Sequence, residues 1–156
     1  MDLKQLYQDI ILEHGKSPRN LGKCEGYSHE AQGYNPLCGD KVHVYLKLDK
    51  RKKVEGLTLE GDGCAISLAS ASIMTELVKG KSFDEAKEIM NAFLDMIKNT
   101  SEINSNDLNE DQKIKIMSLS GVKRFPMRVK CATLAWHTLT SAIEGNREDV
   151  NTESID

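Results

Sequence analysis

The sequence lacks any long apolar run and any signal for secretion. Across its 156 residues, no stretch approaches the roughly 20 consecutive apolar residues that span a bilayer. The first residues, MDLKQLYQDI, lack the basic and then apolar order of a signal peptide. We therefore expect a cytoplasmic protein without a membrane partner.

The sequence also has no excess of basic residues over acidic ones. Lysine and arginine number 21 against 24 aspartates and glutamates, which leaves a formal net charge of −3. This balance argues against a general affinity for nucleic acid, so the expected partners are proteins or small ions. Cysteine is scarce as well, and the four that are present are not expected to form disulfides in a reducing compartment. The remaining possible roles of the four cysteines are burial in the core, catalysis and metal binding.

Apolar alternation predicts a small sheet. Residues 41–49, KVHVYLKLD, alternate strictly between apolar and polar, and residues 54–59 continue the pattern after a charged turn. These two segments predict an antiparallel hairpin. Residues 26–34 carry a weaker pattern that suits an edge strand.

Helical periodicity dominates the rest of the chain. Apolar residues recur at intervals of three and four over 3–11, and the segment 65–78 is apolar on nearly all sides. Ser82 and Glu85 form a capping-box pattern before another helix, and Pro126 precedes the last one. A shorter helical segment is expected at 114–119. The sequence thus predicts an α+β fold, with a small antiparallel sheet of about three strands and helices packed on one face.

The chain length predicts one domain. We expect it to cover residues 1–145 and to contain a polar insertion at about 99–113. The charged residues 146–156 are expected to form a flexible acidic tail.

Three cysteines lie where the predicted elements begin or end. Cys38 lies in the loop YNPLCGDK, and Cys64 follows a glycine-rich stretch at the start of a helix, where the helix dipole favours a thiolate. Cys131 follows Arg128 and Lys130, and cations of this kind also favour the anion. All three thiols are therefore expected to be reactive.

Asp40 adds a carboxylate to these thiols, because Gly39 allows it and Cys38 to turn toward one point. Three thiolates and one carboxylate would suit a closed zinc site, and the same sulfurs could hold iron. The spacing is not the paired C-x-x-C pattern of zinc sites, so burial as small apolar residues stays an alternative. Cys24 and the four histidines are interpreted as bystanders.

The motifs YNPLCGDK, EGDGCAISLASASIM and FPMRVKCATLAW occur in this order, and over about residues 3–144 the chain resembles the NifU/IscU/SufU family of iron–sulfur cluster assembly proteins. The resemblance implies an IscU-like sandwich of sheet and helices. It also implies a metal site at four positions of this chain: Cys38, Asp40, Cys64 and Cys131.

Two departures favour one branch of the family. The scaffold branch typically has a histidine directly before the third cysteine and a Leu-Pro-Pro-Val-Lys segment ahead of it, whereas this chain has Lys130 and FPMRV. Lys130, Trp136 and the polar insertion resemble the SufU branch, which implies zinc and a SufS-type cysteine desulfurase as partner. Arg128 resembles an arginine of the family, and we consider Arg128 and Lys130 candidates for contacting the partner or activating a thiol.

The expected activity is persulfide sulfur transfer, with the protein acting as a sulfur carrier or transferase. Cys38 is the expected sulfur acceptor because its loop is short and flanked by Gly39. The sulfur would then pass to downstream cluster assembly proteins. Two alternatives remain at this point: a scaffold that builds a transient [2Fe-2S] cluster with the same ligands, and a structural zinc protein without sulfur transfer.

Overall fold

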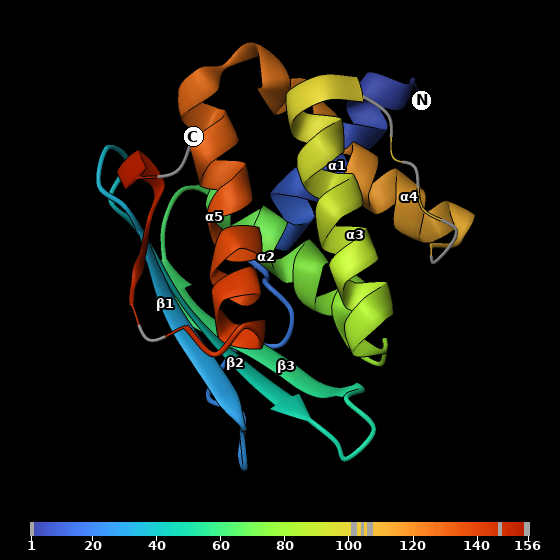
Figure 1. Cartoon of the computed structure of the whole chain (residues 1–156). Helices are drawn as coiled ribbons and strands as arrows, with labels where there is room; N and C mark the ends of the chain where they lie inside the picture. Colours follow the sequence, from blue (N-terminus) through green and yellow to red (C-terminus); the bar gives the residue numbers. More distant parts are fainter. Residues whose placement is uncertain (1, 101–102, 104, 106–107, 147, 155–156) are drawn as a thin grey trace.

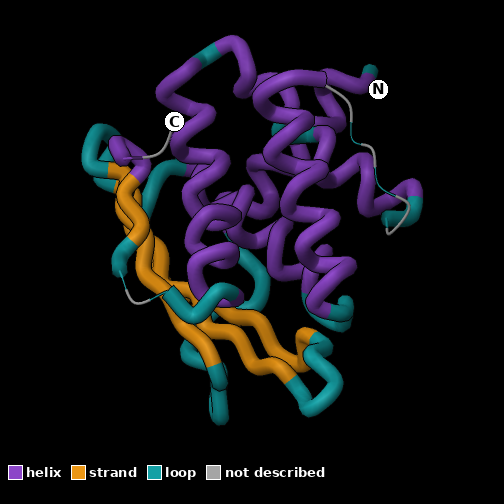
Figure 2. Tube along the Cα trace, in the orientation of Figure 1, coloured by secondary structure: helices purple, strands orange, loops and turns teal. Residues whose placement is uncertain are grey.

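The fold joins one twisted sheet to a layer of helices. The computed structural model describes residues 2–100, 103, 105, 108–146 and 148–154. Figure 1 shows the sheet along one side of the molecule, and Figure 2 shows the helices gathered on one of its faces. This arrangement confirms the predicted α+β fold.

The sheet has four strands in the order β3-β2-β1-β4. The strands are β1 (His29–Asn35), β2 (Asp40–Leu48), β3 (Val54–Asp62) and the short β4 (Val150–Asn151). The first three are antiparallel neighbours, whereas β4 runs parallel to β1. Val42, Val44 and Leu46 are buried against the helices, as the alternation predicts.

The helical layer contains five α-helices in the described part of the chain: α1 (Leu3–Lys16), α2 (Ala65–Val78), α3 (Phe83–Asp95), α4 (Glu110–Met117) and α5 (Pro126–Ile143). Short π and 3-10 segments, η1 (Met96–Thr100), η2 (Ser120–Arg124) and η3 (Thr152–Ser154), complete the described helical structure. The expected capping box is present, since the Ser82 and Glu85 side chains each accept a backbone N–H of the other residue.

The helix α5 lies against β1 and β2 and packs on α2 at its other side. Trp136 is its central contact: the indole stacks on Phe93 with ring centroids 4.1 Å apart, and Nε1 donates to the Ser70 hydroxyl at 2.9 Å. Ser70 in turn donates to the Ala132 carbonyl at 2.5 Å. A buried aromatic residue whose polar atom is bonded holds its helix in one position, so α5 is fixed relative to α2 and α3.

Within residues 146–156, which the sequence predicts to be a flexible tail, the described residues 150–154 form a short strand and a 3-10 segment. Val150 and Asn151 pair with Gly33 and Tyr34 of β1, and the next residue, Thr152, is buried. A two-residue strand is too short to produce a detectable alternation, which is why the sequence pattern does not reveal it.

The polar segment predicted as an insertion at 99–113 lies partly outside the described residues. Its end is helical, because α4 begins at Glu110, four residues before the helical segment expected at 114–119. Asn109 and Gln112 form a second capping box there. Among the helices that the structure describes, none combines the length and apolar character needed to cross a membrane.

The environments of two histidines allow a prediction of how the stability of the folded protein depends on pH. His14 is buried with Nδ1 2.7 Å from the Ser72 hydroxyl, and half-buried His137 lies near Lys98. Burial lowers the pKa of both imidazoles below the ordinary 6.5, and the nearby Arg19 and Lys98 cations lower it further.

Because the unfolded chain then binds protons more strongly, the melting temperature should fall as the pH drops from about 7.5 to about 5.5. The variant His137→Gln should show a smaller fall, measured by thermal unfolding at both pH values. The comparison cancels changes that the two proteins share, and equal falls in both would contradict a role for His137.

Candidate metal centre

The loop between β1 and β2 presents Cys38. Asn35 and Asp40 pair as the last residues of the antiparallel ladder, so only residues 36–39 make the turn. The Gly39 N–H donates to the Asn35 carbonyl at 2.9 Å, with Gly39 in the left-handed region at φ 74°. This turn leaves the Cys38 side chain exposed to solvent.

Asp40 is the first residue of β2, and its side chain is only 1% exposed. One carboxylate oxygen accepts the Cys64 backbone N–H at 2.9 Å, and the other accepts Asn35 Nδ2 at 3.1 Å. A buried carboxylate needs such partners, since an unpaired one would be strongly destabilising. Asp40 therefore connects the start of β2 with the start of α2.

Cys131 occupies the second turn of α5 and is buried. Its sulfur lies 3.4 Å from Asn35 Nδ2. Burial raises the pKa of the Cys131 thiol, and hydrogen bonding to Asp40 and Cys38 raises it further. This result contradicts the expectation that neighbouring cations favour the thiolate at this position.

The two cations have other partners. The Arg128 guanidinium lies over the Phe125 ring, 5.3 Å from its centroid, and Lys130 Nζ donates to a Glu153 carboxylate oxygen at 2.8 Å. Burial, and neither of these cations, dominates the ionisation of the Cys131 thiol.

Cys38, Asp40 and Cys131 form one cluster. One ligand atom from each lies within 4.8 Å of the others, although the three come from a loop, a strand and a helix. Two sulfurs and a carboxylate oxygen at this spacing are a donor set that suits zinc or iron. The cluster is thus able to hold a metal ion.

Cys64 lies at the edge of this cluster as the N-cap of α2. Its sulfur accepts the Ser67 N–H at 3.4 Å and is not one of the three clustered ligand atoms, although its backbone N–H bonds to Asp40. Its role as a fourth ligand therefore stays a prediction. Cys24 lies apart from the cluster, beside Gly56 of β3.

Sequence reasoning missed two residues next to the cluster. Asn35 donates to both Asp40 and Cys131, and the Thr152 hydroxyl donates to the Asn35 side-chain oxygen Oδ1 at 3.1 Å. Asn35 lies within the YNPLCGDK motif, so its position in the motif was a usable signal. Thr152 had none, because 117 residues separate it from Asn35.

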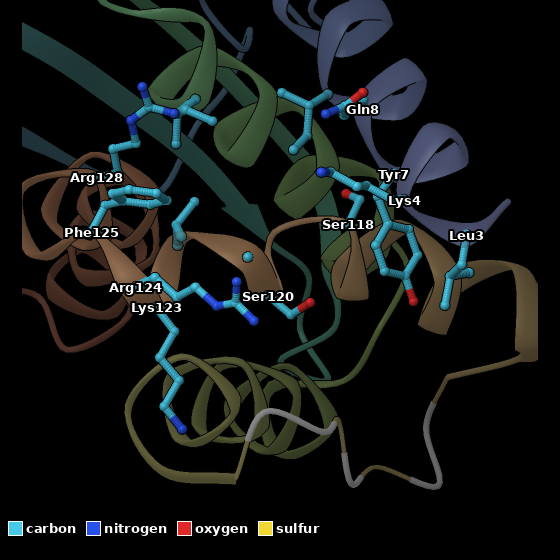
Figure 3. A pocket seen from close by; sticks show the side chains of 14 residues that line it. Leu3, Lys4, Tyr7, Gln8, Ser118, Ser120, Lys123, Arg124, Phe125 and Arg128 are labelled. Carbon is cyan, nitrogen blue, oxygen red and sulfur yellow. The ribbon is translucent and has the colours of Figure 1, made fainter.

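Arg128 also lines an open groove of about 760 Å³ between α1 and the segment that joins α4 to α5. Figure 3 shows Arg128 and Phe125 on one side of this groove and Leu3 and Tyr7 of α1 on the other. The residues of the cluster do not line it. The exposed guanidinium of Arg128 therefore faces a surface that is separate from the thiols.

The fold and this cluster of thiols with a carboxylate are those of an iron–sulfur cluster assembly domain. The NifU-like N terminal domain family matches residues 6–132, and the chain belongs to this family. The predicted resemblance is thereby confirmed.

Two relatives differ in their named activities. The zinc-dependent sulfurtransferase SufU of Bacillus subtilis (strain 168) is 40% identical over 91% of this chain and 92% of its own length. The iron-sulfur cluster assembly scaffold protein IscU of Streptococcus pyogenes serotype M1 is 37% identical over 91% of this chain and 85% of its own length. These similar identities do not separate the two branches.

Solved structures share the fold. The crystal structure of FiSufU from Fervidobacterium islandicum AW-1 matches with a TM-score of 0.78 and 36% identity, over 89% of this chain and 97% of that chain. The N-terminal part of a NifU-like protein from Brucella abortus also has a TM-score of 0.78, over 91% of this chain and 94% of that chain. At 23% identity, this second match supports the fold alone.

A glycine beside Asp40 allows a direct test of the cluster. A Cβ atom at Gly63 would lie 2.6 Å from an Asp40 carboxylate oxygen, so Gly63→Ala should push the carboxylate away. We expect zinc affinity to fall by about tenfold or more, the range seen when the surroundings of metal ligands are disturbed. Competition with a chromophoric chelator measures this change.

The matched control is Gly121→Ala, because a Cβ at Gly121 would meet no atom within 4 Å. This control should bind zinc as the wild type does. Equal zinc affinity in Gly63→Ala and wild type would exclude the Asp40 carboxylate, in its present position, from the metal centre.

Proposed function

We propose that this protein acts in iron–sulfur cluster biogenesis as a zinc-dependent sulfurtransferase. It accepts persulfide sulfur from a SufS-type cysteine desulfurase and passes it to downstream cluster assembly proteins. The observation that supports this most is the exposed Cys38 thiol in a cluster with the buried Asp40 and Cys131. The sulfurtransferase relative supports the same function.

Cys38, Asp40, Cys64 and Cys131 are the proposed zinc ligands. Zinc, when bound, keeps the cysteines deprotonated and reduces their nucleophilicity. The protein exposes the ligands to different degrees: Asp40 and Cys131 are buried and hydrogen-bonded, whereas Cys38 is exposed on a four-residue turn.

Cys38 is the proposed sulfur acceptor. Its thiolate attacks the outer sulfur of the desulfurase persulfide and forms a new S–S bond. The S–S bond within the donor persulfide breaks, and the donor cysteine leaves as a thiolate. Sulfur therefore moves without net oxidation or reduction, and the proton of the persulfide group moves with it.

The alternatives to Cys38 fit this step less well. Cys131 is buried in α5, where a partner's persulfide would reach it only after α5 moved. The Cys64 sulfur caps α2, and moving it would remove the partner of the Ser67 N–H. Only the turn at residues 36–39 has to move for Cys38 to meet a partner.

The position before Cys131 favours sulfur transfer over the scaffold function of the IscU relative. In the scaffold branch, the resemblance implies a histidine at this position, and imidazole is a metal ligand. Here Lys130 occupies it and pairs with Glu153. A protonated ammonium group has no lone pair to offer a metal ion.

The first prediction for this function concerns the resident metal. The purified protein should contain about one zinc ion per chain, and Asp40→Ala should retain zinc less well because it loses a ligand. Elemental analysis of protein prepared without added metal measures both. Stoichiometric iron with visible absorption would support the scaffold instead, and full zinc retention by Asp40→Ala would show that Asp40 is not a ligand.

The second prediction concerns the acceptor cysteine. Cys38→Ser should fold but fail to stimulate a matched desulfurase, whereas Cys24→Ser should behave as the wild type because Cys24 lies apart from the cluster. Peptide mass spectrometry after incubation with desulfurase and cysteine should place the added sulfur on Cys38. Persulfide on Cys64 or Cys131 with Cys38 unmodified would overturn the assignment.

A further inference from the structure

Thr152 is buried within a segment of acidic and polar residues at the end of the chain. It begins η3 directly after β4 and is 2% exposed. Its hydroxyl donates to the Asn35 side-chain oxygen at 3.1 Å. A buried hydroxyl directed at a buried amide is a specific contact, since each group would otherwise lose hydrogen bonds to water.

Both polar atoms of the Asn35 side-chain amide form hydrogen bonds. Nδ2 donates to the Asp40 carboxylate at 3.1 Å and lies 3.4 Å from the Cys131 sulfur, while the side-chain oxygen accepts from Thr152. Both acceptors of Nδ2 carry negative charge when they bind a metal ion. Rotating the amide by half a turn would place its oxygen against these charges, so the observed orientation is the favourable one.

The segment that carries Thr152 is attached to the site on two sides. Val150 and Asn151 pair with the two residues of β1 that directly precede Asn35. Glu153 pairs with Lys130, the residue before Cys131. The C-terminal segment 150–154 therefore bridges the strand that ends at Asn35 and the helix that carries Cys131.

We propose that Thr152 and Asn35 are positioning residues of the metal centre. Thr152 fixes the Asn35 amide, and the amide holds Asp40 and Cys131 in place to bind the metal. This inference rests on the metal binding in the proposed function and adds to it that the C-terminal segment 150–154 is part of the site.

Removing the Thr152 hydroxyl would leave the Asn35 oxygen buried without a donor. The amide would then gain by rotating or shifting toward another partner, and its Nδ2 group would leave Asp40 and Cys131. Partners of this kind orient the ligands that they touch, and their loss typically weakens metal affinity by about 10- to 100-fold.

The test compares Thr152→Val, which keeps the side-chain shape, with Thr152→Ser, which keeps the hydroxyl. Zinc affinity is measured by competition with a chromophoric chelator, and the absorption bands of Co²⁺ bound in place of zinc report the ligand geometry. The matched control is Thr140→Val, because the Thr140 hydroxyl donates to the Trp136 carbonyl within α5 and not to Asn35 or a proposed metal ligand.

We expect Thr152→Val to bind zinc about tenfold more weakly and to shift the Co²⁺ bands, while Thr152→Ser and Thr140→Val match the wild type. Wild-type affinity and an unchanged spectrum in Thr152→Val would overturn the inference, and so would equal losses in Thr152→Ser. If Thr152→Val does not fold, Thr152→Ala is judged by the same criteria. A wild type that binds neither metal would instead refute the metal centre of the proposed function.

Discussion

Asp40 places a carboxylate in the interior of the molecule where β2 begins, and the surrounding segments are arranged to satisfy it. The Cys64 N–H at the start of α2 and the Asn35 amide at the end of β1 both donate to it. These hydrogen bonds compensate for burying the charge, and they also bring the cysteines of separate segments together. The ability of the cluster to hold a metal ion thus depends on the hydrogen bonds that stabilise the buried Asp40 carboxylate.

The centre combines buried ligands with one exposed ligand. Cys131 lies in a helix that the Trp136 indole fixes to α2 and α3, whereas Cys38 lies on a turn of four residues at the surface. A site that only stabilised the fold would gain from burying every ligand. The exposure of one thiol instead leaves it accessible to a partner protein, as the proposed sulfur transfer requires.

Much of the fold was predictable because its elements have strong local signals. The alternation at Val42, Val44 and Leu46 and the capping box at Ser82 identified β2 and α3, since burial on one face and end capping act over a few residues. The strand β4 could not be predicted in this way. Two residues carry no periodicity, and their pairing with β1 depends on where the sheet edge lies after folding.

The sequence by itself determined the candidate ligands Cys38, Asp40, Cys64 and Cys131, because their types and order within their motifs limit the chemistry to thiolates and a carboxylate. Only the tertiary structure decided how readily these ligands ionise and which neighbouring side chains hydrogen-bond to them. Burial raises the pKa of the Cys131 thiol although basic residues precede it, and Thr152 reaches the site from the far end of the chain. The physical reason is that desolvation and hydrogen bonding depend on distances in space, which spacing along the chain does not specify.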